Sequence, residues 1–305
     1  MGLGQELFEW LSPILKEFGE AYPGFLPGEF FPSYFLYEYF HRPLIASIIV
    51  AIVAGFLGTF LLIRNLALIG DGLAHVSFGA IAIGLIFGGI GPLLYALVFC
   101  TVAAVLIDEL QARGILEGDA AIAIFMTGML GLGLVIMRIW GGTASGIVDG
   151  YLYGDLLLVD PKSFDIIVTI CVIGYLSMLF LYHSLLSISI DPIAAKVQGL
   201  PVRAIRLYFS IITAAIVVSM VQIVGVLLVT ALIVAPAATA QLIGKSFRSY
   251  VILSQIIGVI TVIIGLYFSA EYDTGSGSMI ALVSASIFAL ILIIKTMKNI
   301  IVKPN

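Results

Sequence analysis

Residues 72–107 read GLAHVSFGAIAIGLIFGGIGPLLYALVFCTVAAVLI and contain no aspartate, glutamate, lysine or arginine. Crossing the hydrocarbon core of a bilayer takes about 20 helical residues, so this 36-residue run is too long for one helix. Its centre is Gly88-Gly89-Ile90-Gly91-Pro92, which is a strong turn signal. The stretch therefore predicts two membrane-spanning helices joined by a tight turn.

The rest of the chain repeats this pattern. Further long runs without these four charged residue types are 43–63, 120–137, 166–190, 207–244, 249–270 and 274–294. The run 207–244 is again long enough for two helices, with Gln222 and Gly225 near its middle. We therefore expect an all-α, polytopic integral membrane protein with about nine transmembrane helices, within a range of eight to ten.

The composition agrees with a membrane protein and excludes some other classes. Of the 305 residues, 61% are hydrophobic and 10% are charged, whereas a soluble domain carries about 25% charged residues. The net charge of -4 gives no indication of nucleic-acid binding, which needs a basic surface. Cys100 and Cys171 both lie within apolar runs and are expected to be small core residues.

The basic residues predict the orientation, because short cytoplasmic loops collect lysine and arginine. If the last span ends in the cytoplasm, four basic residues lie outside: Lys16, Arg42, Arg138 and Lys162. The other ten then lie on the cytoplasmic side: Arg64, Arg113, Lys196, Arg203, Arg206, Lys245, Arg248, Lys295, Lys298 and Lys303. This bias predicts a cytoplasmic C-terminus in a multi-pass protein of the cell membrane.

The chain divides into three expected parts: a leader at 1–42, a transmembrane domain at 43–298 and a cytoplasmic tail at 299–305. The leader has six acidic residues against two basic ones and is rich in aromatics. We expect an amphipathic helix in the membrane interface, with these side chains toward lipid: Phe8, Trp10, Leu11, Ile14, Leu15 and Phe18. An irregular leader is the alternative.

Asp71 and His75 are ionisable residues within an apolar segment. Their i, i+4 spacing puts both side chains on one face of a helix. Ionisable groups within a span usually face a bundle interior or a water-filled path, and this pair suits Zn, Mn or Fe(II). A proton relay would use the same two residue types, and a buried hydrogen bond that only packs helices is a third interpretation.

Three further carboxylates are weaker candidates for metal ligands. Asp149 follows a glycine-rich stretch, and Glu271 and Asp273 precede the last apolar run. They could line an entrance for a cation on the outer side. Ordinary solvated loop carboxylates are the simpler interpretation.

A short helix is predicted at 192–198, on the side rich in basic residues. Asp191 suits the N-cap, Pro192 the first helical position and Gly199 the position after the end, while Pro201 prevents continuation. Helices shorter than about 12–15 residues are marginal in water, so this one needs a packing partner. It suits docking of a cytoplasmic protein, or else forms a structural elbow between spans.

Several motifs, in order, resemble the permease subunit of the zinc/manganese ABC importer family. They are Gly55-Phe56-Leu57-Gly58, Gly70-Asp71-Gly72-Leu73-Ala74-His75, Asp191-Pro192 with Gly199-Leu200-Pro201-Val202, Gln222 to Val229, and Ala235-Pro236-Ala237-Ala238-Thr239-Ala240. The similarity runs from about Pro43 to about Ile294. Departures are the long leader and the last outer loop from Asp273 to Ser278, where the family commonly has prolines.

The resemblance implies a type II ABC importer-like permease that acts as a homodimer in the lipid bilayer. It implies two cytoplasmic ATP-binding subunits and an extracytoplasmic metal-binding protein as partners. Asp71 and His75 would bind the transported zinc or manganese ion transiently, with iron as a further candidate, and no cofactor would be permanently bound. The coupling segment that docks on the ATPase would comprise Pro192, Ala194, Ala195, Lys196, Gly199, Leu200, Pro201 and Val202.

No enzymatic activity is expected of this chain. The stretch Thr239 to Ser246 approaches a Walker A loop, but threonine stands where that loop requires glycine. ATP hydrolysis is therefore expected on separate chains. An autonomous secondary transporter with Asp71 and His75 as a proton relay is the alternative, although such a carrier would not need the short helix at 192–198.

Overall fold

The computed structural model describes residues 2–21, 28–89, 91–140, 150–152, 154, 159–226 and 229–302, and every extended regular element in these ranges is a helix. In chain order they are α1 (Leu3–Ala21), α2 (Ser33–Leu36), α3 (Glu38–Ile63), α4 (Ile69–Phe87), α5 (Pro92–Ala112), α6 (Gly118–Trp140), α8 (Pro161–Phe180), α9 (Tyr182–Ile190), α10 (Pro192–Val197), α11 (Val202–Val224), α12 (Val229–Ile243), α13 (Phe247–Tyr272) and α14 (Ser276–Val302). The all-α prediction is confirmed.

Eight helices in the described part of the chain are long and apolar enough to cross a membrane: α3, α4, α5, α6, α8, α11, α13 and α14. Helix α12 is also apolar but has only 15 residues. Its length of about 22 Å, at 1.5 Å per residue, is less than the 30 Å of a hydrocarbon core. The predicted nine spans thus correspond to eight full-length helices and one short one.

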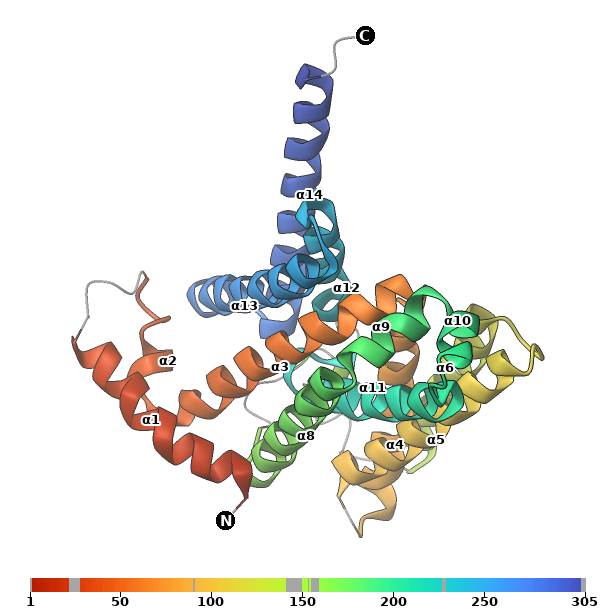
Figure 1. Cartoon of the computed structure of the whole chain (residues 1–305). Coiled ribbons are helices and arrows are strands. Elements are labelled where there is room, and N and C mark those ends of the chain that lie inside the picture. The colour runs from red at the N-terminus through yellow and green to blue at the C-terminus, as the bar shows by residue number, and fades with distance from the viewer. Residues whose placement is uncertain are drawn as a thin grey trace.

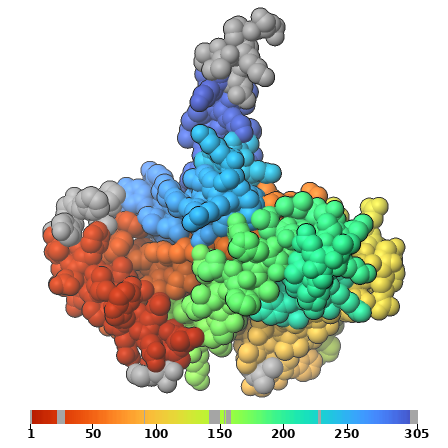
Figure 2. Space-filling view, viewed as in Figure 1, coloured from red at the N-terminus to blue at the C-terminus, as the bar shows by residue number. Residues whose placement is uncertain are grey.

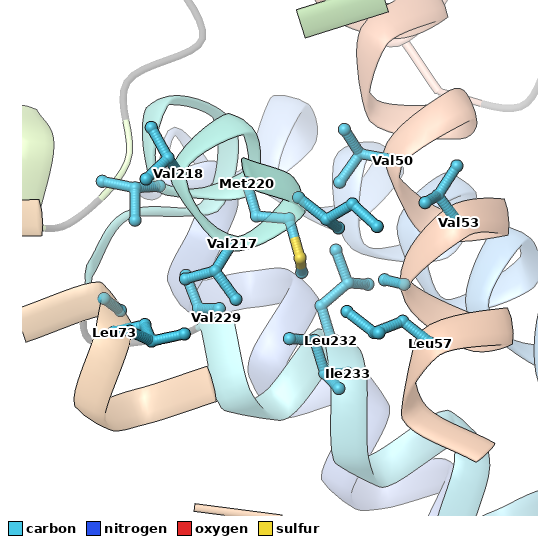
Figure 3. Close-up of a cluster of buried hydrophobic side chains, with 14 of the residues drawn as sticks. Val50, Val53, Leu57, Leu73, Val217, Val218, Met220, Val229, Leu232 and Ile233 are labelled. Carbon is cyan, nitrogen blue, oxygen red and sulfur yellow. The ribbon is translucent and has the colours of Figure 1, made fainter. Parts of the chain in front are cut away.

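Helix α3 occupies the middle of the bundle (Figure 1) and packs against α8, α11, α12 and α13. Figure 3 shows the apolar cluster that joins α3, α4, α11 and α12. Its labelled side chains are Val50, Val53, Leu57, Leu73, Val217, Val218, Met220, Val229, Leu232 and Ile233, each at most 3% exposed. This cluster fixes α4 and α12 relative to each other.

Both predicted hairpin breaks are confirmed. Helix α4 ends at Phe87 and α5 begins at Pro92, and the glycines between them at 88, 89 and 91 have positive φ angles. Helix α11 ends at Val224, and Gly225 follows with φ +85°. Only glycine adopts such angles without strain, so these positions set the ends of the helices.

Two element boundaries differ from the prediction. Helix α3 begins at Glu38 rather than near Pro43. Pro43 has no N–H to donate to the carbonyl of Tyr39. Because Tyr39 is in the first turn and is exposed, the missing hydrogen bond does not prevent the helix from starting at Glu38. The run 166–190 is two helices, α8 and α9, that meet at Leu181. No glycine or proline marks that junction. The domain boundaries at 42 and 298 stay predictions.

The N-terminal helix α1 crosses the ends of α3 and α8 instead of running along them (Figure 1). Trp10 is 67% exposed, but Phe8 is buried edge-to-face against Phe164 of α8. The expectation that Phe8 faces lipid is therefore wrong, because this side of α1 packs on the bundle. The backbone N–H of Gly4 also donates to the carboxylate of Asp165, over 2.7 Å.

The last helix, α14, projects away from the other helices. Figure 2 shows its C-terminal part as a column that rises from the body of the molecule. The described side chains of this part are largely exposed and apolar, and include Leu290, Ile293 and Ile294. An apolar surface of this kind is suited to lipid or to another apolar chain.

Candidate functional site

Asp71 and His75 lie on one face of α4, as their spacing predicts. Helix α4 begins at Ile69, so Asp71 is in its first turn and His75 in its second. Nε2 of His75 is 3.8 Å from Oδ1 of Asp71, and the two side chains are 13% and 32% exposed. This distance is too long for a hydrogen bond. Two ligands about 2.1 Å from one tetrahedral Zn²⁺ would be about 3.4 Å apart, so a small adjustment would let both atoms reach one ion.

Neighbouring residues fix the direction of this pair. Leu73, between them in sequence, points into the apolar cluster of Figure 3, and its carbonyl accepts a hydrogen bond from the Cys100 thiol of α5 over 3.2 Å. Gly72 and Gly79 let α4 approach α6 closely, because a Cβ at either position would overlap Ile122 or Met129. Helix α4 is thus held by α5, α6, α11 and α12, while Asp71 keeps access to open space.

Helix α12 contributes the remaining polar contact. The hydroxyl of Thr230 is 3.4 Å from Oδ1 of Asp71. Thr230 is the second residue of α12, so the N-terminal ends of both α4 and α12 lie near this carboxylate. The positive end of a helix dipole favours a negative charge, and short helices that begin within a span supply such ends in transporters.

Thr230 was not among the residues predicted from the sequence. Its signal was present, because the break at Gly225 starts a new helix within an apolar run. Which carboxylate would lie near that new helix depends on how α4 and α12 pack. This contact could not be read from local sequence.

One ring nitrogen of His75 lacks a hydrogen-bond partner in the described part of the chain. Nδ1 of His75 is buried and has no hydrogen-bond partner among the described residues. A buried polar atom without a partner is costly, so such atoms usually indicate a missing ligand or water. The described residues contain no group of three or more histidine, cysteine, aspartate or glutamate side chains that could hold a metal. One chain therefore brings one carboxylate, one imidazole and one hydroxyl to this place.

Two of the three weaker candidates, Glu271 and Asp273, lie at the end of α13. The carboxylate of Glu271 accepts hydrogen bonds from the backbone N–H groups of Glu29, Phe30 and Phe31, over 3.1, 2.9 and 2.9 Å. It thereby attaches the segment before α2 to the end of α13. Asp273 follows α13 with φ +50° and lines a hollow of about 520 Å³. Asp149 lies outside the described residues. A metal role for these three stays a prediction.

The short helix predicted at 192–198 is confirmed as α10, one residue shorter. The Asp191 carboxylate accepts hydrogen bonds from the backbone N–H groups of Ile193 and Ala194, over 2.8 and 3.0 Å, and Gly199 has φ +83°. Ala195 is buried, whereas Ile193 and Val197 are 77% and 84% exposed. Helix α10 therefore packs against the rest of the chain on the side of Ala195 and exposes the apolar side chains of Ile193 and Val197.

Ion pairs join the beginning of α11 to the end of α5 beside α10. Nε of Arg206 is 2.9 Å from the carboxylate of Asp108, and an amino group of Arg203 is 3.2 Å from that of Glu109. Arg113 also contacts Glu109, over 2.7 Å. Helix α5 in turn contacts α4 through Cys100. The short helix and the Asp71–His75 pair are thus connected by a continuous set of packed elements.

Comparisons with known proteins agree with this arrangement. A family model described as the ABC 3 transport family matches residues 36–295. The manganese transport system membrane protein MntC of Halalkalibacterium halodurans is 31% identical over 86% of this chain and 89% of its own length. The high-affinity zinc uptake system membrane protein ZnuB of Haemophilus influenzae is 28% identical over 84% of this chain and 97% of its own.

A solved structure is similar as well. It is PsaBC from Streptococcus pneumoniae in complex with Fab, with a TM-score of 0.76 and 28% identity. The match covers 85% of this chain and 92% of that one.

Proposed function

The chain belongs to the ABC 3 transport family, and from this membership we propose that it is the membrane-spanning permease subunit of an ATP-driven importer for divalent transition-metal ions, manganese or zinc. Relatives named for manganese and zinc transport support both metals. Family membership favours an ABC permease over an autonomous secondary transporter. ATP hydrolysis is then assigned to separate partner chains.

The observation that carries the proposal is the Asp71–His75 pair, whose Oδ1 and Nε2 atoms lie 3.8 Å apart on one face of α4. The carboxylate and the neutral imidazole would bind the ion during its passage, and the Thr230 hydroxyl would hold the carboxylate in place. Two protein ligands make a weak site, and a permeation site must release what it binds. In a homodimer with its two-fold axis beside α4, two such pairs would supply four ligands, with water completing the coordination.

Substitution of the pair tests the metal role. Asp71→Asn keeps the size of the side chain but removes its charge, and His75→Leu removes the ligand while suiting an apolar span. We expect both variants to be inserted normally and to lose at least about tenfold in metal uptake. Loss of a group that only orients a metal ligand already costs about 10–100-fold, and loss of a ligand should cost no less. Uptake of radioactive manganese or zinc by vesicles that hold the complete transporter measures this.

The control is His183→Leu, which removes an exposed histidine of α9 far along the chain from the pair. It should transport at the normal rate. If Asp71→Asn and His75→Leu also transport normally but unfold more easily, the pair only packs helices and the proposed ion path is wrong.

We also propose that α10 docks on the cytoplasmic ATP-binding subunit. The exposed Ile193 and Val197 form an apolar surface on a helix too short to be stable alone, which supports a protein partner. Movement of α10 would reach α11 through the elbow at Pro201 and α5 through the Arg206–Asp108 pair. The same assignment puts the C-terminus in the cytoplasm, and a reporter active only there should be active when fused after Lys303.

Gly199→Val tests the docking role. Valine at φ +83° is strained, so the end of α10 should be distorted while the distant spans remain folded. We expect loss of the stimulation of ATP hydrolysis by the reconstituted permease. Gly128→Val is the control, because Gly128 lies on the exposed face of α6 with open space around it. Full stimulation in the Gly199→Val complex would contradict the proposal.

A further inference from the structure

A hollow of about 760 Å³ lies beside α10, between the end of α5 and the beginning of α11. Four of its lining side chains are basic and one is acidic: Arg113, Lys196, Arg203 and Arg206, with Glu109. The metal site and the exposed Ile193 and Val197 of α10 do not line this hollow. Four lining residues also belong to the coupling segment that the family resemblance implies: Lys196, Leu200, Pro201 and Val202.

The positive charges in the hollow are only partly neutralised. Arg113 and Arg203 share one carboxylate oxygen of Glu109, over 2.7 and 3.2 Å, so a single negative charge faces two guanidinium groups. Arg206 is paired with Asp108. Lys196 has no ion-pair partner in the part of the chain that the structure describes. The hollow thus has an excess of positive charge and suits an anionic group.

Apolar stripes lead from the spans to the hollow. On α5, Val102 and Leu106 are 54% and 45% exposed, and the same face continues through Glu109 to Arg113. On α11, Tyr208 and Ile211 are each 39% exposed and lie on the face that begins at Ala204. Ala204 lines both this hollow and a smaller apolar one of about 420 Å³ with Phe180 and Tyr208.

We propose that this hollow binds the headgroup of an anionic phospholipid, with the acyl chains lying along the exposed stripes of α5 and α11. Basic hollows between transmembrane helices are suited to anionic headgroups. The apolar stripes suit a lipid, because its acyl chains can lie along them while its headgroup reaches the charges of the hollow. The inference needs only that the chain spans a membrane, and it does not rest on the proposed metal transport.

Lipid retention by the full-length chain tests the proposal. The purified protein is exchanged into detergent that contains equal amounts of phosphatidylglycerol and phosphatidylcholine, and the bound lipids are counted by native mass spectrometry. We expect preferential retention of phosphatidylglycerol. Lys196→Gln and Arg203→Gln should each lower this preference about fivefold, since each basic residue near a headgroup contributes about that factor.

A charge change of opposite sign makes the test specific. Glu109→Gln removes the one acidic side chain of the lining and should strengthen the preference, whereas damage to the fold would weaken it. The matched control is Lys162→Gln, at the beginning of α8 where Asp165 binds α1, far from the hollow; it should leave the preference unchanged.

Three results would overturn the proposal. Equal retention of both lipids by the unmodified chain would show that the hollow does not select an anionic headgroup. Displacement of phosphatidylglycerol by millimolar inorganic phosphate would identify an anion site that needs no acyl chains. Unchanged lipid preference in Lys196→Gln and Arg203→Gln, together with lost assembly with the ATP-binding subunit, would assign the hollow to that protein.

Discussion

Helices α3 and α14 have nearly the same hydropathy and opposite surroundings. Their most apolar stretches have mean hydropathy values of 2.6 and 2.5, yet 83% of the stretch in α3 is buried and only 22% of that in α14. In water, apolarity decides what is buried, but lipid is as apolar as a leucine side chain. Hydropathy therefore predicts that a helix enters the membrane and does not predict its place in the bundle.

Small residues account for the central position of α3. A Cβ at Gly58 would overlap the carbonyl oxygen of Ile233 in α12, and one at Gly55 would lie 2.9 Å from the backbone of Ser254 in α13. The hydroxyl of Ser254 donates to the carbonyl of Gly55 over 2.8 Å. Close backbone approach of this kind drives association in a bilayer. Helix α14 instead presents large exposed side chains along much of its length.

The largest effect is expected from one leucine-to-alanine change made in each helix. Leu57 of α3 is fully buried in the cluster of Figure 3, whereas Leu290 of α14 is 60% exposed. Leu57→Ala leaves a cavity and should lower the free energy of unfolding by about 3 kcal/mol. Leu290→Ala leaves none and should change it by less than about 0.5 kcal/mol. Unfolding in mixed micelles with increasing dodecyl sulfate measures both.

Equal losses in the two variants would mean that α14 is as tightly packed as α3 in the assembled protein. The difference in burial between α3 and α14 would then exist only in the isolated chain. A loss at Leu290 that appears only at high protein concentration would identify contact with a second copy of the chain.

A smaller effect is expected from adding one methyl group. Gly58→Ala forces α3 away from α12 and should cost about 1–3 kcal/mol, as overpacking does. Gly128→Ala in the exposed face of α6 meets open space and should stabilise its helix by up to about 1 kcal/mol. The midpoint of thermal unfolding, followed by size-exclusion chromatography, should shift in opposite directions. A Gly58→Ala protein as stable as the parent would contradict the role given to close approach.

Much of the fold could be predicted because charges and turn glycines mark the ends of spans. Gly88 to Pro92 and Gly225 identified both helix breaks correctly. The junction at Leu181 was missed because it has no glycine or proline, and it follows from packing of α9 against α3. The start of α3 was placed too late. Pro43, in the second turn, leaves only the carbonyl of Tyr39 without its helical bond, and Tyr39 is exposed in the first turn, so the cost is small.

The candidate site was predictable only within one helix. The i, i+4 spacing of Asp71 and His75 fixes their shared face whatever surrounds them. The contact of Asp71 with Thr230 and the binding of Glu271 to residues 29–31 join segments 159 and about 240 residues apart. Such contacts depend on how whole helices pack, and local sequence carries no record of them.

The carboxylate of Glu271 also sets the order in which the protein can be completed. The backbone groups of residues 29–31 leave the ribosome early, but their partner is translated about 240 residues later. At about 5–20 residues per second, the wait is about ten to fifty seconds. During this interval the amides of residues 29–31 lack their partner, whereas α1 can already pack on α8 once residues 161–180 have been made. The segment before α2 is therefore made early and attached late, and it must stay at the membrane surface until the end of α13 arrives.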